Sequence, residues 1–360
     1  MHPYKTLDEK AFWGPAVARR GALDIDELWA PKFLIPKNRS VVTFGSCFAQ
    51  HISLALQERG FGWLNTEPAP RHLSPASARK FNYGVFSCRT GNIYTVSLLA
   101  QWVDWALGNT EVPDEIWEND GRYYDPFRPN IEPNGFASAK ELLRSREIAV
   151  QAFAKAITSC RVFIFTLGLT ESWVNARKGY EYPMCPGTVA GEYDPEIHRF
   201  ENQKFQSISD TLTLTLKKIR RANPKISVLL TVSPVPLTAT NSGDHVLVAT
   251  VRSKSILRAV AAEIVANRKF VDYFPSYEIV TGIPFKGRFF ESNLRHVTQA
   301  GVDHVMNRFF SVIEAKNATK SKWRKKFKKV VKPDQATAED IVCEEEVLAA
   351  FADPIRPPKP

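Results

Sequence analysis

Apolar residues along this chain occur in short continuous runs separated by longer amphipathic stretches. The runs, rich in Val, Ile, Leu and Phe, lie at residues 41–44, 161–166, 226–232 and 270–274. Stretches with helical spacing of apolar residues lie at residues 48–60, 94–107, 137–159, 205–222, 250–267 and 298–313. Continuous apolar runs are typical of strands buried on both faces, and their alternation with helices predicts a mainly parallel sheet covered on both sides. The predicted fold class is α/β.

Two stretches interrupt this alternation and predict loop insertions. Residues 108–134 are rich in Pro, Asp and aromatic residues, with a hairpin expected at residues 116–124. Residues 180–202 form a second irregular excursion. The rest of the chain is divided into an N-terminal arm (residues 1–34), one domain (residues 35–315) and a flexible tail (residues 316–360).

The turn after the first apolar run carries two side chains that can act as nucleophiles. Gly45 ends the run, and Ser46 and Cys47 precede the first helical stretch. A sharp strand-to-helix turn directs side chains and backbone N–H groups to one spot, where the positive helix N-terminus favours a nucleophile. The alternative is structural, with a buried cysteine beside a serine that caps the helix.

A histidine stands in the loop before the last helical stretch. His296 ends the string NLRH, and Thr298 is the expected N-cap of the following helix. Ligands of parallel sheets bind beyond the carboxyl ends of the strands, so the turns after the apolar runs should meet around one crevice. This loop can present an imidazole at the mouth of the sheet, although a loop histidine more often has a structural role.

Composition and cysteine spacing indicate the class of protein and the kinds of site that are not expected. Hydrophobic residues make up 44% and charged residues 24% of the 360 positions, which is ordinary for a globular protein. The five cysteines are scattered and form no CxxC pair, which predicts neither a disulfide framework nor a metal site. Without a recognisable secretory signal or membrane-spanning run, the expected compartment is a reducing cytoplasm.

The net charge of +10 is unevenly distributed, and the densest run of basic residues stands at the start of the tail. Residues 316–332 contain nine Lys or Arg and no acid, whereas residues 333–360 contain seven acids and two bases. Apolar residues at helical spacing within the basic part predict a helix on an anionic membrane surface, peripheral to the inner membrane, with a solvated linker as the alternative. No nucleic-acid recognition fold accompanies it, so specific nucleic-acid binding is not expected. The acidic part should be disordered or weakly helical around residues 344–351.

Five short motifs resemble those of one protein family. They are GSCFA at 45–49, GNIYT at 91–95, GLTESW at 168–173, TVSPVP at 231–236 and FPSYEI at 274–279. On these motifs the chain resembles the GSCFA domain family over about residues 1–315. That family looks like a divergent branch of the SGNH (GDSL-type) esterases and acyltransferases. The resemblance implies a flavodoxin-like, SGNH-like three-layer α/β/α fold with a mainly parallel sheet.

The same resemblance implies which residues form the site. On the Gly-Asp-Ser block of the SGNH enzymes, Gly45 keeps its place, Ser46 falls on the Asp and Cys47 falls on the nucleophile. On the Gly-x-Asn-Asp block, Thr170 falls on the Asn that donates to the oxyanion. The remaining matches are Gly168 and Glu171 in that block, Gly91 or Gly84 as the second backbone donor, and Asn293 with His296 on the Asp-x-x-His block.

Asn293 departs from the superfamily, which has a carboxylate at this position. A neutral amide cannot stabilise an imidazolium as a carboxylate does, although it can still orient the ring. A thiol depends less on that carboxylate, because a Cys–His pair can generate a thiolate directly. We therefore expect a Cys47–His296 dyad with a depressed pKa at Cys47, and Ser46 as the rival nucleophile.

The expected function is that of an ester hydrolase or O-acyltransferase acting on a carbohydrate, in the biosynthesis of a bacterial surface polysaccharide. The partner would be a carbohydrate or a small acyl ester; no cofactor is required, and acyl-CoA is the candidate acyl donor. Residues that would bind the oxyanion or the substrate are Gly45, Gly91, Gly168, Thr170 and Glu171. The competing hypothesis is a non-catalytic SGNH-like module that binds glycan or a biosynthetic partner.

Overall fold

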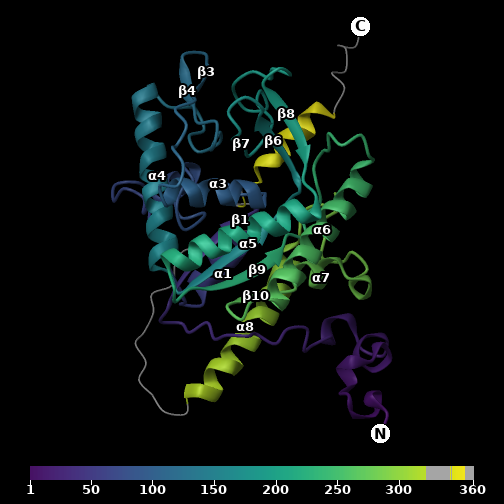
Figure 1. The fold of residues 1–360 in the computed structure, drawn as a ribbon. Helices are drawn as coiled ribbons and strands as arrows, with labels where there is room; N and C mark the ends of the chain where they lie inside the picture. Colours follow the sequence, from purple (N-terminus) through teal and green to yellow (C-terminus); the bar gives the residue numbers. More distant parts are fainter. Residues whose placement is uncertain (322–340, 342, 353–360) are drawn as a thin grey trace.

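A five-stranded parallel sheet forms the centre of the computed structural model, which describes residues 1–321, 341 and 343–352 (Figure 1). Its strands are β1 (Ser40–Gly45), β2 (Gly62–Trp63), β5 (Val162–Leu167), β9 (Ser227–Val232) and β10 (Val271–Tyr273). They lie in the order β10-β9-β5-β1-β2, and every neighbouring pair is parallel. Numbered along the chain this is the flavodoxin-like order 2-1-3-4-5, whose ligand crevice opens between β1 and β5. The predicted fold class is confirmed.

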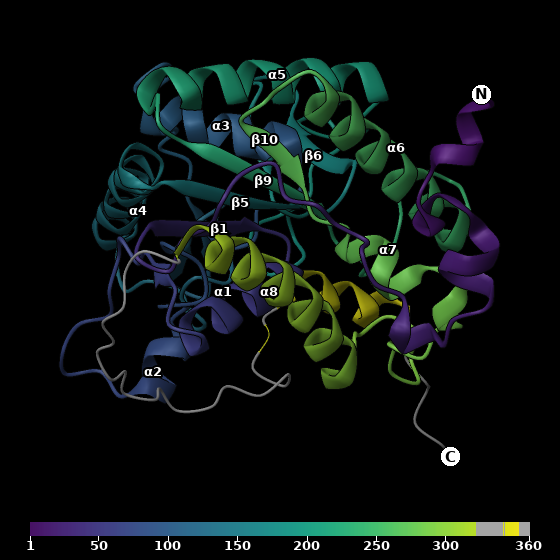
Figure 2. The same ribbon diagram turned by 90° about the horizontal axis from the view of Figure 1, so that it is seen from below.

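Helices cover both faces of the sheet and complete three layers (Figure 2). One layer contains α1 (Phe48–Glu58), α7 (Ser276–Thr281) and α8 (Gln299–Ser321). The opposite layer contains α3 (Val96–Ala106), α4 (Ala139–Ser159), α5 (Phe205–Ala222) and α6 (Val246–Ala266). All but α7 overlap a predicted helix. α6 begins before residue 250 and α8 continues past residue 313.

Strand side chains point alternately to the two faces and build two separate cores. Val41 and Ile164 pack in the core that contains α1 and α8, whereas Val42, Phe44 and Phe163 pack in the core of the opposite layer. All five side chains are fully buried. Strands covered on both faces need apolar residues at successive positions, which is why their sequences read as continuous apolar runs.

Parts of the predicted loops contain regular structure. The hairpin expected in the first insertion is confirmed as β3 (Trp117–Asn119) and β4 (Arg122–Tyr124). The second insertion is more ordered than expected: it contributes β7 (Glu181–Tyr182) and β8 (His198–Asn202), which pair with the preceding strand β6 (Glu171–Asn175) in an antiparallel sheet. A short helix, α2 (Pro75–Lys80), lies between β2 and α3, where no helix was predicted. Elements of two to six residues are too short to show a clear hydrophobic period.

A buried ion cluster fastens the first insertion to α4. The Asp125 carboxylate lies 2.8 Å from Arg128 and 2.9 Å from Arg146, and all three side chains are at most 2% exposed. Removing one partner of such a cluster would leave an uncompensated buried charge, at a cost of roughly 3–5 kcal/mol. The insertion is therefore an integral part of the body.

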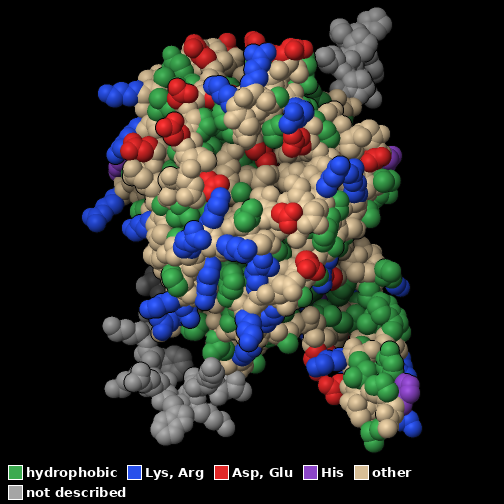
Figure 3. Space-filling view, viewed as in Figure 1, with side chains coloured by type: hydrophobic (Ala, Val, Ile, Leu, Met, Phe, Trp, Pro, Cys, Tyr) green, Lys and Arg blue, Asp and Glu red, His purple; other side chains and the backbone are tan. Residues whose placement is uncertain are grey.

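The N-terminal arm projects from the body as short helical turns (Figure 1). It becomes anchored at Trp29, whose buried indole donates to Asp272 at 3.3 Å. Figure 3 shows apolar side chains on the arm, with Lys and Arg gathered over the lower part of the body on the same face. Among the described residues, none of the helices combines the length and apolar character that crossing a bilayer requires. The predicted basic helix at residues 316–332 lies outside the described residues beyond Ser321.

Candidate active site

The turn between β1 and α1 packs tightly against the end of β5. Gly45 pairs with Thr166 and has a φ of +128°, and a Cβ at position 45 would lie 2.3 Å from the Thr166 carbonyl oxygen. The Ser46 N–H donates to that carbonyl at 3.1 Å. Only glycine fits this backbone and this space. The turn thereby holds Ser46 and Cys47 at the crevice between β1 and β5.

Ser46 and Cys47 have different surroundings. Cys47 lines a cavity of about 460 Å³, here called the thiol cavity, which His51 and His296 also line. Ser46 Oγ is buried and finds no hydrogen-bond partner within the described part of the chain. Its Cβ lies close to Gly168, where an added Cβ would be 3.1 Å away. The structure thus brings Cys47 and His296 together in one cavity.

Asn293 fixes the orientation of the His296 ring. Its Oδ1 accepts hydrogen bonds from the backbone N–H groups of Arg295 and His296, each at 3.0 Å. The amide nitrogen is left to face His296 Nδ1, at 2.7 Å. Because an amide nitrogen only donates, Nδ1 accepts and the proton of the neutral ring lies on Nε2.

A segment from the C-terminal part of the chain covers this site. Residues 343–351, here called the acidic segment, contain three consecutive glutamates and the helical turn Glu344–Phe351. In Figure 1 the segment lies beside β6 and β8. Cys343 lines the thiol cavity together with Cys47, and Arg295 donates to Cys343 Sγ at 3.4 Å. The expectation of a disordered or weakly helical stretch here did not anticipate this packing.

The two thiols have opposite pKa shifts. Interaction with the Cys343 thiol, together with burial, raises the pKa of the Cys47 thiol well above its ordinary value. The same interaction, together with the positive charge of Arg295, lowers the pKa of the Cys343 thiol. The depressed pKa expected for Cys47 is therefore not found, because burial and the neighbouring Cys343 thiol both favour the protonated form of Cys47.

Two cationic side chains border the crevice. Lys254 is buried and donates to the Gly168 carbonyl at 2.7 Å, and burial lowers its pKa to about 8. Arg295 lies 3.4 Å from the Glu345 carboxylate and 3.5 Å from that of Glu346. The Glu346 carboxylate is also hydrogen-bonded to His296 Nε2. The two cations thus give the crevice a positive charge that faces the carboxylates of the acidic segment.

Gly91 borders the crevice through its contact with the acidic segment. It has a φ of +68°, and a Cβ there would lie 3.2 Å from Glu344 Oε1. The N–H of Asn92 donates to the same carboxylate at 3.4 Å. Burial raises the pKa of Glu344 to about 7. The loop expected to supply a backbone donor therefore donates to a carboxylate of the chain itself.

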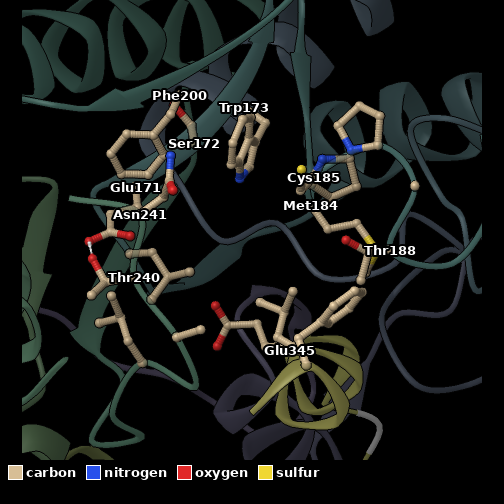
Figure 4. Close-up of a pocket in the computed structure, with 18 of the residues that line it drawn as sticks. Glu171, Ser172, Trp173, Met184, Cys185, Thr188, Phe200, Thr240, Asn241 and Glu345 are labelled. Carbon is tan, nitrogen blue, oxygen red and sulfur yellow. Dashed lines mark hydrogen bonds between the residues drawn. The ribbon is translucent and has the colours of Figure 1, made fainter. Parts of the chain in front are cut away.

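Thr170 and Glu171 lie away from the thiol cavity, which neither lines in the described structure. The buried Thr170 hydroxyl donates to Asn202 at 2.8 Å. The Glu171 carboxylate accepts a hydrogen bond from Thr240 at 2.6 Å (Figure 4). Burial raises the pKa of Glu171. Glu171 lines a second cavity, whereas Thr170 lines neither that cavity nor the thiol cavity.

That second cavity, here called the aromatic cavity, has a volume of about 510 Å³. Trp173, Tyr193 and Phe200 line it from the three-stranded sheet and its loops. In Figure 4, Glu345 projects into it from the helical turn of the acidic segment. Leu348 and Phe351 of the same segment also line it. The acidic segment therefore borders both cavities.

Lys254 and Arg295 were not among the predicted site residues. Lys254 is spaced with Leu257 and Ala261 on the buried face of α6, and a lysine at such a position is a signal that the sequence does contain. Arg295 directly precedes His296. The acidic segment has no comparable signal, because its partners are distant in the sequence; Glu344 and Asn92, for example, are 252 positions apart.

The described residues contain no cluster of three His, Cys, Asp or Glu side chains arranged to hold a metal ion.

Among known protein families, the GSCFA family matches this chain over residues 40–309. No curated protein matches it. The match begins at β1 and ends within α8, so it includes Cys47, Lys254 and His296 but not the acidic segment.

Proposed function

The chain belongs to the GSCFA family, and we propose that it is an ester hydrolase or O-acyltransferase acting on a carbohydrate. Cys47 would be the nucleophile and His296 the base, with Asn293 positioning the ring. The proposal is carried by the thiol cavity, to which the end of β1 contributes Cys47 and the loop before α8 contributes His296. A nucleophile and a base around one cavity are the parts that acyl transfer needs.

The proposed reaction begins when Cys47 transfers its proton to His296. The thiolate attacks the ester carbonyl carbon, and the tetrahedral oxyanion collapses to a thioester on Cys47. The departing alkoxide takes the proton from His296. Water then attacks the thioester in a hydrolase, or a sugar hydroxyl attacks it in an acyltransferase. The attacking group gives its proton to His296, which returns it to the Cys47 thiolate.

This role of His296 sets a requirement on Asn293. Nε2 can accept a proton only when the neutral ring carries its proton on Nδ1. Asn293 meets that requirement when its amide turns, so that Oδ1 accepts from Nδ1. The turn gives up the two hydrogen bonds that Oδ1 accepts from the loop backbone.

Several groups near Cys47 could stabilise the oxyanion. Cys47 directly precedes α1, so the N–H of Phe48 is one candidate; the next two N–H groups of the helix already donate to the carbonyls of Ser46 and Cys47. Ser46 Oγ, buried and without a partner in the described structure, is a further donor. Lys254 adds a positive charge within electrostatic reach of Cys47. The Thr170 hydroxyl would have to leave Asn202 to take part.

The wider biological setting is also a proposal. Acyl-CoA would be the donor for a transferase, and its thiolate would leave in place of the alkoxide. The acceptor would be a carbohydrate of surface-polysaccharide biosynthesis, in the cytoplasm beside the inner membrane. This setting rests on the resemblance to SGNH acyltransferases and on the scattered cysteines, which suit a reducing compartment.

Mass spectrometry after incubation with p-nitrophenyl acetate or acetyl-CoA tests the proposal. The full-length Cys343→Ser, Glu346→Gln variant is the appropriate protein, because both side chains cover the site. We expect an acetyl adduct on Cys47 that His296→Ala slows by about 100-fold. Cys160→Ser, at a buried cysteine that lines neither the thiol cavity nor the aromatic cavity, is the control and should leave the adduct unchanged. An adduct on Ser46 would reassign the nucleophile, and its absence from both residues would contradict the proposal.

One observation favours the second candidate, a non-catalytic module that binds glycan or a biosynthetic partner. Asn293 donates to His296 Nδ1 and so leaves the ring without a free acceptor nitrogen facing the cavity. In such a module Cys47 and His296 would only shape a binding surface. Binding of a carbohydrate without any acyl adduct would support this candidate.

A further inference from the structure

The acidic segment makes specific contacts with the groups that would do the chemistry. Cys343 lines the thiol cavity together with Cys47, the proposed nucleophile. Glu346 is hydrogen-bonded to Nε2 of His296, the atom that would receive the nucleophile's proton. Both contacts join residues far apart in the sequence. The segment therefore occupies the space that a substrate would need between nucleophile and base.

Each glutamate of the segment also has its own polar partner in the crevice. Glu344 accepts from the backbone N–H of Asn92 at 3.4 Å. Glu345 pairs with Arg295 at 3.4 Å and lies within electrostatic reach of the buried Lys254. Three successive carboxylates are thus matched by a backbone donor, two cations and an imidazole. A segment packed only by its apolar residues would not need this matching.

The other end of the segment is apolar and reaches the aromatic cavity. Leu348 and Phe351 line that cavity together with Trp173. Val347, between the charged and apolar ends, is 39% exposed. The segment therefore extends from the thiol cavity to the aromatic cavity and separates them.

We propose that the acidic segment is an intramolecular ligand of one continuous groove, and that it competes there with ligands combining carboxylate and apolar groups. The inference concerns the site of the proposed function and names both its occupant and the chemistry that displaces it. With the segment in place, Cys47 keeps its proton and has no access to a substrate carbonyl. Release of the segment opens the thiol cavity and the aromatic cavity to each other.

The rate at which iodoacetamide alkylates Cys47 tests this occupancy in the full-length protein. Glu345→Arg combined with Glu346→Arg places two cations beside Arg295, which should expel the segment. We expect Cys47 alkylation, mapped by mass spectrometry near neutral pH, to rise by about 10-fold or more. Ala350→Arg adds a charge at an exposed position of the same segment and should leave the rate unchanged. Equal rates in the wild type and the double variant would overturn the proposal.

A disulfide trap on the unmodified chain guards against misfolding of that variant. Diamide should join Cys47 to Cys343: the two thiols lose two electrons and two protons, and the N=N bond of diamide is reduced to a hydrazine. The cross-linked peptide should dominate over every other cysteine pair. Its absence would show that the segment does not dock in solution and would overturn the proposal.

A peptide added in trans tests the ligand chemistry. The probe is the nonapeptide of residues 343–351 with serine in place of Cys343, added to the Glu345→Arg, Glu346→Arg chain. We expect this peptide to slow Cys47 alkylation again. A peptide with three glutamines in place of the glutamates should require an about 10-fold higher concentration for the same protection. Equal protection by both peptides would overturn the role of the carboxylates. Alkylation and cross-linking need no catalytic base, so this outcome is independent of the acyl-adduct experiment.

Discussion

The thiol cavity and the aromatic cavity are similar in size, about 460 and 510 Å³, but different parts of the fold build them. Around the thiol cavity, Cys47 and His296 come from loops at the ends of elements in the central parallel layers. Around the aromatic cavity, Trp173 and Phe200 come from the small antiparallel sheet inserted between β5 and α5. The first cavity carries reactive groups, whereas the second offers apolar surface.

Under the proposed function, the parallel core would hold the reacting groups and the inserted sheet would contact the substrate. Reactive groups need fixed geometry, and the close contact of Gly45 with Thr166 supplies it. Recognition needs a surface that can differ between substrates, and an inserted sheet supplies that without disturbing the core. The acidic segment touches both regions, with carboxylates at the first and apolar side chains at the second.

Asn293→Asp is expected to have the largest effect on a measured rate, that of acyl-adduct formation on Cys47. Its structural effect should be confined to the thiol cavity. An aspartate would accept from His296 Nδ1–H and leave Nε2 free to take the Cys47 proton. In the Cys343→Ser, Glu346→Gln background, the acyl adduct on Cys47 should form about 100-fold faster. Time-resolved mass spectrometry measures this rate.

Asn293→Ala provides the matched control for that gain. It removes the amide and its hydrogen bonds to the loop backbone but supplies no acceptor for Nδ1. Its adduct should form no faster than that of the parent chain. Should the aspartate and alanine variants react alike, the imidazole would not be the base, and the binding-module candidate would gain support.

Glu181→Gln tests the inserted sheet through pH. Glu181 on β7 accepts hydrogen bonds from the hydroxyls of Thr95 and Ser97, and burial raises its pKa to about 7. The native state therefore retains this proton when the unfolded chain has already lost it. This contribution to stability is complete below about pH 4.5 and is lost as the pH rises through about 7. The slope from this group is at most ~1.4 kcal/mol per pH unit.

Urea unfolding between mildly acidic and mildly alkaline pH measures this dependence. The Glu181→Gln chain should lose part of the wild-type slope and be the more stable of the two at alkaline pH, by ~1–2 kcal/mol. Glu118→Gln, at an exposed position of β3, is the control and should keep the wild-type slope. Parallel wild-type and Glu181→Gln curves would show that the inserted sheet does not depend on a protonated carboxyl.

The sequence was most informative for the parallel core. Val41, Val42 and Phe44 reveal β1 because burial on both faces demands apolar residues at successive positions. Cys47 and His296 could be proposed as neighbours because the ends of parallel strands and the loops beside them meet at one edge of the sheet. These inferences use local patterns together with one general rule of topology.

The acidic segment could not be predicted, because its contacts have no local pattern. Glu344 finds its partner at Asn92, 252 positions away, and consecutive glutamates in a charged tail are more typical of disorder. The tautomer of His296 likewise follows from the way Asn293 Oδ1 is committed to backbone N–H groups. Hydrogen-bond direction at this level depends on three-dimensional geometry.

The smallest expected effect is that of Leu348→Ala on the Cys47 alkylation rate, which tests whether the aromatic cavity helps to hold the segment over Cys47. Leu348→Ala removes apolar surface from a half-buried side chain that lines this cavity, which should weaken docking by ~1 kcal/mol. If alkylation proceeds through brief opening of the segment, the Cys47 rate should rise about 5-fold. Val347→Ala, one position earlier, removes apolar surface that is 39% exposed and should change the rate by less than about 2-fold. Equal rates for the two variants would mean that the polar contacts alone hold the segment, and that the two cavities do not act as one groove.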